Sequence, residues 1–142
     1  MSETLNLYVE DVDFTLPSQE PLLKWFKKVC EEKGHTLNKL NLIFCSDSYL
    51  LEINRKYLNH DYYTDIITFD YVEGQKVSGD LFISTERVME NAKNLKISFK
   101  DELDRVMIHG LLHLLGYEDS TETKQAEIKA QEDFCLTLRS QN

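Results

Sequence analysis

The sequence predicts an α+β fold in which a small mixed sheet of four strands is packed against about five helices. Short runs rich in alternating or β-branched residues recur between segments whose apolar residues have helical spacing. A loop signal at residues 73–76, Glu-Gly-Gln-Lys, lies between two of these runs and favours an antiparallel hairpin. The chain has 142 residues, 42% of them hydrophobic, so we expect a single domain with its own core over residues 1–142.

The first half of the chain is expected to alternate strands with helices. Residues 5–9 alternate apolar and polar side chains, as a strand with one buried face does. The apolar positions in residues 22–33 have helical spacing, and Gly34 ends that helix. Residues 40–45 are a short apolar run suited to a second strand, and a helix follows over about residues 49–58. The expected N-caps of these helices are Ser18 for the first and Ser46 or Asp47 for the second.

The second half is expected to supply the hairpin and three more helices. Residues 66–71 are rich in β-branched and aromatic residues and predict a third strand, and residues 77–84 predict the fourth. Gly79 inside that strand indicates a close approach by another segment. The first of the three expected helices starts at Ser84 or Thr85. The second starts at about Phe99, after a capping box formed by Ser98 and Asp101, and ends near Leu115. The third starts at Thr121 or Thr123 and ends near Leu138, and its apolar residues are Ala126, Ile128, Ala130, Phe134 and Leu138.

The helix expected over residues 99–115 ends in the motif His-x-x-x-His-x-x-Gly-x-x-Asp, formed by His109, His113, Gly116 and Asp119. Histidines four residues apart project from one face of a helix, so both imidazoles reach one cation. Gly116 adopts the left-handed conformation that ends a helix, and the returning chain delivers Asp119 as a third ligand. Two imidazoles and a carboxylate with an open position are typical of a catalytic zinc, so we expect one Zn²⁺ per chain at the end of this helix.

Three alternatives to this interpretation stay open in the sequence. His109 and His113 are also compatible with ordinary polar positions on an amphipathic helix whose leucines form the core. Glu118 is the alternative third ligand. A metallopeptidase is disfavoured because Gly110 stands where zinc peptidases carry the glutamate that acts as general base. Proton transfer therefore has to come from metal-bound hydroxide, the substrate or another part of the chain.

Composition restricts the class of protein further. The net charge of -9 argues against a protein that coats nucleic acid by bulk electrostatics, although a local basic patch is compatible with it. The three cysteines are far apart and form no C-x-x-C pair, which indicates a reducing compartment. The first residues lack the basic and apolar regions of a secretory signal, and no apolar stretch approaches the length of a membrane span. We therefore expect a cytoplasmic protein with no membrane contact.

Two segments of the chain resemble the YbeY family, the bacterial rRNA maturation factors described as metal-dependent single-strand endoribonucleases. The family's His-Gly-x-Leu-His-Leu-x-Gly-Tyr-Asp-His is matched over residues 109–117. The family's Asn-x-x-Tyr-Arg and Thr-Asp-Val-Leu-Ser-Phe resemble residues 54–57 and 64–69, and its Gly-Asp-Ile-x-Ile-Ser resembles residues 79–84. Two positions depart from the pattern: the family's third histidine falls on Asp119, and its arginine falls on Leu58. Arg55 or His60 is the expected substitute for that arginine.

The resemblance implies a zinc-dependent endoribonuclease that cleaves single-stranded RNA, with pre-rRNA and the 3′ end of 16S rRNA as the substrate. The metal ligands His109 and His113 then act through metal-bound water, since a Lewis acid polarises a phosphoryl oxygen and supplies hydroxide without a side-chain base. The small ribosomal subunit or its proteins and an assembly GTPase are the expected partners. A ribosome-assembly factor with a structural metal is the main alternative, because an acidic surface suits basic ribosomal proteins. The expected substrate contacts are Arg55, His60, Tyr62 and Tyr63. The first helix also carries Lys24, Lys27 and Lys28, which either form a solvated face or contact further phosphates.

Overall fold

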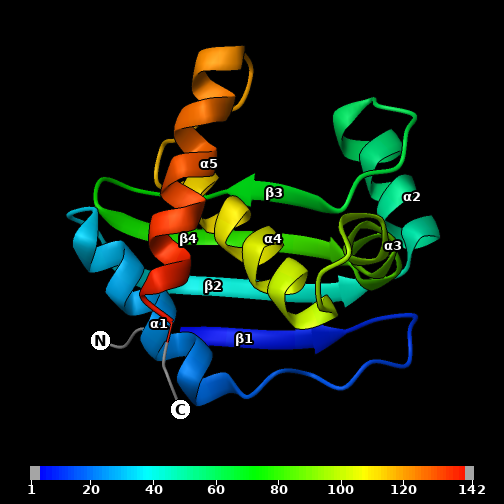
Figure 1. Cartoon of the computed structure of the whole chain (residues 1–142), viewed down its shortest axis with the longest axis horizontal. Helices are drawn as coiled ribbons and strands as arrows, with labels where there is room; N and C mark the ends of the chain where they lie inside the picture. Colours follow the sequence, from blue (N-terminus) through cyan, green and yellow to red (C-terminus); the bar gives the residue numbers. More distant parts are fainter. Residues whose placement is uncertain (1–3, 140–142) are drawn as a thin grey trace.

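The computed structural model describes residues 4–139, so the first and last three residues of the expected domain, 1–3 and 140–142, lie outside it. The described chain confirms an α+β fold with a four-stranded mixed sheet and helices packed on it (Figure 1). Its elements follow in the order β1 (Thr4–Val9), α1 (Gln19–Glu32), β2 (Thr36–Cys45), α2 (Asp47–Leu58), β3 (Ile66–Asp70), β4 (Lys76–Ser84), α3 (Thr85–Leu95), α4 (Phe99–Leu114) and α5 (Glu122–Thr137).

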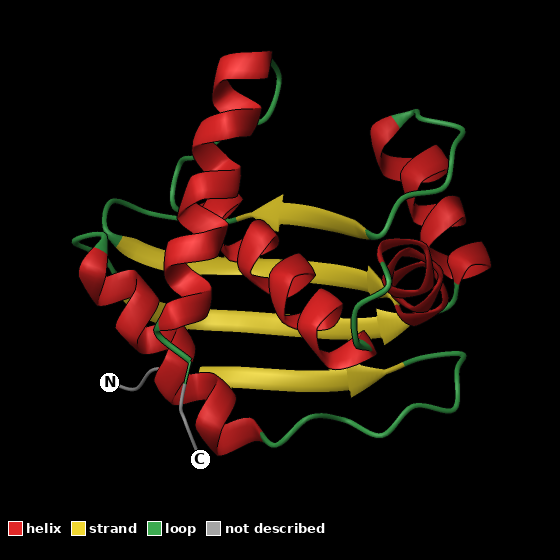
Figure 2. Ribbon diagram, in the orientation of Figure 1, coloured by secondary structure: helices red, strands yellow, loops and turns green. Residues whose placement is uncertain are grey.

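The sheet has the strand order β1-β2-β4-β3. β1 and β4 both pair with β2 in parallel, whereas β3 pairs with β4 in antiparallel, which confirms the expected hairpin. Helices α1, α4 and α5 lie across one face of the sheet, and α2 and α3 lie near the end where β2 and β4 finish (Figure 2). The main core fills the space under α1 and α4, and a second small cluster of Cys45, Leu50 and Ile67 lies under α2.

Two glycines let α4 lie unusually close to the β3–β4 hairpin. A Cβ added to Gly79 would lie 2.6 Å from the backbone oxygen of Phe69 and 2.9 Å from the Leu114 methyl groups. A Cβ added to Gly110 would lie 2.7 Å from the terminal methyl of Ile66. The close approach expected at Gly79 is therefore confirmed, and it fixes the height of the histidine-bearing helix over the sheet.

Four side-chain caps stabilise the helix starts, at about 1 kcal/mol each. In each case a serine or threonine oxygen accepts a hydrogen bond from the backbone N–H three residues later. The caps are Ser46 for α2, Ser84 for α3, Ser98 for α4 and Thr121 for α5. Ser18 holds the N-cap position of α1 but makes no such bond.

Three element predictions need correction. β2 begins at Thr36 instead of residue 40, because Thr36, Leu37 and Lys39 pair with β4, and pairing with β1 starts at Lys39. α1 begins at Gln19, three residues before the start expected from its apolar positions. In α5 the buried line is Ile128, Glu132 and Cys135, whereas the apolar Ala126, Ala130 and Phe134 are exposed. None of the helices in residues 4–139 is long and apolar enough to cross a membrane.

Candidate metal centre

Helix α4 places the two histidines of the motif side by side. His109 and His113 lie one turn apart, and their Nε2 atoms are 3.0 Å from each other. The side chains are 24% and 26% exposed, so both imidazoles border solvent while their helix is packed on the sheet. One side of α4 thus presents a pair of nitrogen atoms at one point.

The turn after α4 brings Asp119 to the same point. Gly116 has φ +103°, and the N–H of Tyr117 donates to the backbone oxygen of Leu112 at 3.0 Å, which ends the helix and reverses the chain. As a result, Oδ2 of Asp119 lies 3.3 Å from Nε2 of His109 and 3.5 Å from Nε2 of His113. The role expected for Gly116 in ending the helix is confirmed.

The hydrogen bonds of the two imidazoles determine which nitrogen faces Asp119. Nδ1 of His113 lies 3.0 Å from the backbone oxygen of Tyr117, which can only accept, so this nitrogen carries the proton. Nδ1 of His109 lies 2.6 Å from Oε2 of Glu132. In the neutral form of each ring, the unprotonated Nε2 therefore faces Asp119. Burial lowers the pKa of His109, but the hydrogen bond and charge of Glu132 outweigh burial and raise it.

With both rings neutral, three acceptor atoms converge here, and they repel one another unless a proton or a metal ion lies among them. Their separations of 3.0, 3.3 and 3.5 Å match the spacing of about 3.3 Å between ligands of a tetrahedral zinc whose bonds are about 2.0–2.1 Å long. In residues 4–139, the cluster of three ligand-type side chains with donor atoms within 4.8 Å of one another is His109, His113 and Asp119. The residues present thus fit a metal ion.

Glu118, the alternative third ligand, lies outside this cluster. Its carboxylate pairs with Nζ of Lys124 at 2.6 Å and is exposed. The hydrogen bond and charge of Lys124 lower the pKa of Glu118. The structure also adds a steric reason against a zinc-peptidase mechanism, because the Cα–H of Gly110 faces Ile66 and Leu81 of the sheet and leaves no room for a glutamate side chain.

Glu132 of α5 belongs to the centre, and the sequence prediction missed it. The residue is 7% exposed, and it also accepts a hydrogen bond from Arg105 of α4 at 2.9 Å. Burial raises the pKa of Glu132, but the hydrogen bonds from His109 and Arg105 outweigh burial and leave the pKa below its usual range. The signal in the sequence was its spacing: Glu132 falls at i+4 from Ile128 and i−3 from Cys135, on the buried stripe of α5.

The histidines form part of the wall of a polar cleft with a volume of about 620 Å³. Its other walls are the end of α2, the following loop, β3 and the turn after α4. Among the described residues that line it there are four carboxylates and no lysine or arginine. The lining residues are Asn54, Leu58, His60, Tyr62, Thr64, Asp65, Ile66, Ile67, Thr68, Asp70, His109, His113, Gly116, Tyr117, Glu118 and Asp119.

The structure brings two of the four expected substrate contacts to this cleft. His60 and Tyr62 line it, with their rings stacked at 5.1 Å and 20°. Arg55 does not line it, because the guanidinium pairs with Asp61 at 2.6 Å and with Glu52 at 3.4 Å. Tyr63 does not line the cleft either, because its ring packs against Arg87. The lysines of α1, Lys24, Lys27 and Lys28, are also absent from the cleft lining.

Asp65 and Leu58 complete the description of the cleft wall. Burial raises the pKa of Asp65, and the nearby charge of His109 opposes this shift. Leu58, which stands where the resembled family has an arginine, lies in the wall itself. Neither Arg55 nor any other described cation replaces that arginine at the cleft.

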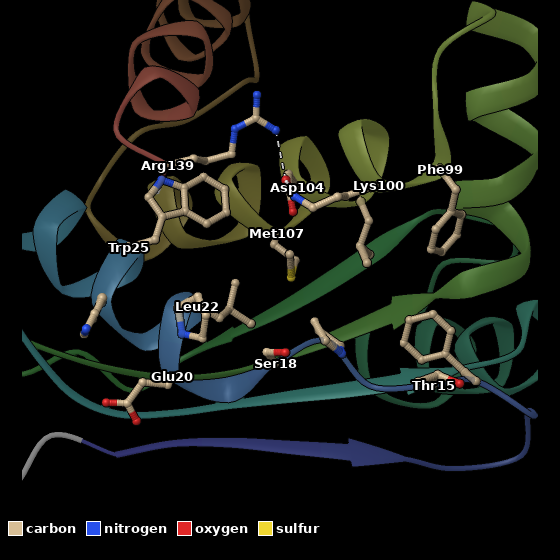
Figure 3. Close-up of a pocket in the computed structure, with 15 residues that line it drawn as sticks. Thr15, Ser18, Glu20, Leu22, Trp25, Phe99, Lys100, Asp104, Met107 and Arg139 are labelled. Atoms are coloured by element: carbon tan, nitrogen blue, oxygen red, sulfur yellow. Dashed lines mark hydrogen bonds and ion pairs between the residues drawn. The ribbon is translucent and has the colours of Figure 1, made fainter. Parts of the chain in front are cut away.

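A second cavity, of about 530 Å³, lies between α1, α4 and residues 14–18 (Figure 3). Most of its lining is apolar, including Trp25 and Met107, and Arg139 pairs with Asp104 at 2.9 Å on its border. It contains none of the three clustered ligand residues. The polar cleft, which holds the three clustered ligand residues, is therefore the candidate site.

Comparisons with known proteins identify the family of this chain. The model of the family described as endoribonuclease YbeY matches residues 8–139. The chain belongs to the YbeY family. The endoribonuclease YbeY of Cytophaga hutchinsonii is 46% identical over 138 residues, covering 96% of each chain. That of Amoebophilus asiaticus is 48% identical over 130 residues, covering 91% of this chain and 88% of its own.

A solved structure confirms the fold. The solution structure of TM1509 from Thermotoga maritima has a TM-score of 0.66 and 24% identity, covering 95% of this chain and 88% of its own. With the family membership, the activity is that of an endoribonuclease, an enzyme that hydrolyses phosphodiester bonds in RNA. Members of this family are metal-dependent nucleases, and the His109, His113 and Asp119 group is consistent with that requirement.

Proposed function

We propose that this YbeY family member is a zinc-dependent endoribonuclease that cleaves single-stranded RNA. One observation carries the proposal: Nε2 of His109, Nε2 of His113 and Oδ2 of Asp119 converge within 3.0–3.5 Å at the wall of an open cleft. Zinc bound there supplies Lewis-acid polarisation of a phosphoryl oxygen and activation of water. Two nitrogen donors and one oxygen donor favour zinc over magnesium, which prefers oxygen ligands.

The cleft residues of the chain bind and orient the RNA. The stacked rings of His60 and Tyr62 offer an aromatic surface on which one unpaired base stacks, and stacking of this kind needs a base that is not already in a duplex. The side-chain amide of Asn54 donates to the backbone oxygen of Tyr62 at 2.9 Å and holds the loop in place. These contacts favour single strands over duplex RNA.

The acidic cleft has a consequence for substrate affinity. Because no lysine or arginine is among its described lining residues, few phosphate counterions are released when RNA binds. The enzyme is therefore expected to bind RNA weakly and with a shallow dependence on salt. Substrate selection then depends on partners that present the RNA. We propose that the substrate is pre-rRNA at the 3′ end of 16S rRNA and that the reaction takes place in the cytoplasm. The proposed partners are the small subunit or its proteins and an assembly GTPase.

The net charge of -9 favours an additional role as an assembly factor, because an acidic surface suits contact with basic ribosomal proteins. In that alternative the metal is structural, and binding to the small subunit does not require His113. Binding that persists unchanged in the His113→Ala variant would support this role alone.

The test combines metal analysis with RNA cleavage. Purified protein is expected to hold about one zinc per chain and to cleave a single-stranded oligoribonucleotide, and His113→Ala is expected to lose both properties. Glu118→Gln is the matched control, because it neutralises a carboxylate next to Asp119 that pairs with Lys124. Zinc loss in the control equal to that in His113→Ala, or cleavage that survives without metal, would refute the proposal.

A further inference from the structure

A chain of charged groups, with the buried Glu132 at its centre, lies behind the candidate metal centre and links α5 to α4. Oε2 of Glu132 lies 2.6 Å from Nδ1 of His109, and its Oε1 accepts from Nη1 of Arg105 at 2.9 Å. Nη2 of Arg105 reaches Asp133 at 2.8 Å. The Glu132 side chain is 9% exposed, so the carboxylate has left water for these two partners.

Desolvation makes this arrangement costly unless the partners are fixed. A buried carboxylate is destabilising by itself, and it is tolerated when charged donors hold both oxygens. Arg105 holds one oxygen, which leaves the other aimed at a single nitrogen of His109. The carboxylate therefore favours the His109 tautomer that has the proton on Nδ1 and a lone pair on Nε2.

We propose that Glu132 is a positioning residue that holds His109 in the orientation and tautomer in which Nε2 faces the cleft, with Arg105 fixing Glu132 in turn. The inference rests on the proposed metal site, since Nε2 is the atom offered to the ion. The two histidines differ here. His113 is oriented by the backbone oxygen of Tyr117, which belongs to its own helix end, whereas His109 depends on a side chain 23 residues away.

A carboxylate behind a metal-binding imidazole also makes the imidazole a stronger donor. Removal of such a partner weakens metal affinity by about 10- to 100-fold. In Glu132→Gln the negative charge is gone, and the amide N–H₂ group can donate to Nδ1, which stabilises the tautomer that has its proton on Nε2. We therefore expect a zinc affinity lower by about 10- to 100-fold in this variant.

The chain offers a matched control in the neighbouring residue. Asp133→Asn removes the same charge and also loses a contact with Arg105, but Asp133 is exposed and its described partner is Arg105, not His109. An effect that comes from charge removal or from loosening α5 will appear in both variants. An effect that acts through His109 will appear in Glu132→Gln alone.

Two measurements on the zinc-free and zinc-loaded full chain test the inference. Competition with a chromophoric chelator gives the zinc dissociation constant, and long-range ¹H–¹⁵N NMR spectra give the tautomer of His109 in the zinc-free protein. The parent and Asp133→Asn are expected to show the Nδ1–H tautomer and equal zinc affinity. Glu132→Gln is expected to show a mixed or Nε2–H tautomer and the weaker affinity, while thermal unfolding reports whether it is folded.

The outcomes separate this inference from the proposed function. A parent that shows the Nδ1–H tautomer, lost in Glu132→Gln, but binds no zinc would refute the metal proposal and keep the orienting role of Glu132. Unchanged tautomer and affinity in folded Glu132→Gln would overturn the inference. If Glu132→Gln does not fold, Glu132→Asp decides, because the shorter side chain keeps the charge but withdraws the carboxylate from Nδ1 of His109. A wild-type tautomer and affinity in that variant would overturn the inference equally.

Discussion

Substitution of Gly79 by alanine tests whether the close packing of α4 on the hairpin supports the metal centre. The added Cβ would lie 2.6 Å from the backbone oxygen of Phe69, which cannot rotate away, and 2.9 Å from two methyl groups of Leu114. Overpacking of this kind costs about 1–3 kcal/mol, and alanine recovers about 0.5–1 kcal/mol of backbone entropy in a strand. The difference between the midpoints of these two ranges gives an expected net loss in the free energy of unfolding of about 1 kcal/mol.

The strain is also expected to reach the zinc ligands. Leu114 follows His113 directly, so either the Leu114 side chain changes rotamer or α4 shifts at the end that carries the ligand, and we expect the packed core to oppose the first. Binding sites tolerate displacements of only about 0.5 Å, so zinc affinity should fall together with stability. Gly79→Ala is therefore predicted to weaken zinc binding without altering any residue in the cleft.

Urea unfolding of the zinc-free protein measures the first effect, and chelator competition measures the second. Gly74→Ala is the matched control in the same hairpin, because Gly74 has φ +61° and nothing lies within 4 Å of an added Cβ. It should lose stability through backbone strain, by about 1 kcal/mol, and keep the zinc affinity of the parent. A Gly79→Ala variant as stable as the parent, or one that binds zinc equally well, would refute the reasoning.

Three further predictions concern the cleft and the core. Tyr62→Ala should raise KM for a single-stranded oligoribonucleotide by a factor that matches the loss of about 1–3 kcal/mol for one stacked base, with little change in kcat. Tyr63→Ala removes a ring that packs on Arg87 and should leave KM unchanged, so equal effects in the two variants would contradict the stacking role. Burial raises the pKa of Cys45 to about 12, so this thiol should resist iodoacetamide at pH 8 in the folded protein and react with it in urea. Mass spectrometry measures the labelling, and rapid labelling of Cys45 in the native protein would contradict its burial. Burial, and then the charge of Asp65, raises the pKa of Glu102, so this residue stabilises the fold fully below its unfolded pKa of about 4.5 and loses that effect as the pH rises through the folded pKa. Glu102→Gln should therefore reduce the fall in the free energy of unfolding above pH 4.5. Parallel profiles of unfolding free energy against pH in parent and variant would contradict this.

Local patterns along the chain were sufficient for most helices, strands and caps. The N-caps at Ser46, Ser84, Ser98 and Thr121 depend on a hydrogen bond to a backbone N–H only three residues away, so the nearby sequence contains the whole interaction. The pairing of His109 with His113 is equally local, since helical periodicity places residues i and i+4 on one face. The family resemblance, confirmed by the comparisons, depended on the same short segments.

Contacts between distant segments were beyond such patterns. The exposed face of α5 was misjudged because alanine and phenylalanine are apolar in any context, while burial depends on which side of α5 meets α4. Arg55 and Tyr63 are expected substrate contacts, but in the structure Arg55 pairs with Asp61 and Tyr63 packs against Arg87, and neither lines the cleft. Each of these side chains had more than one available partner, and only the packed chain selects among them.

The sequence by itself determined the order of the elements, the α+β class and the histidine pair, because these follow from periodicity and capping within a few residues. The tertiary structure alone decided the strand order, the acidic lining of the cleft and the carboxylate of Glu132 behind His109. The physical reason is that these features arise between segments far apart in the chain, where the free energy of burying and pairing charges selects one arrangement among several that are locally equivalent.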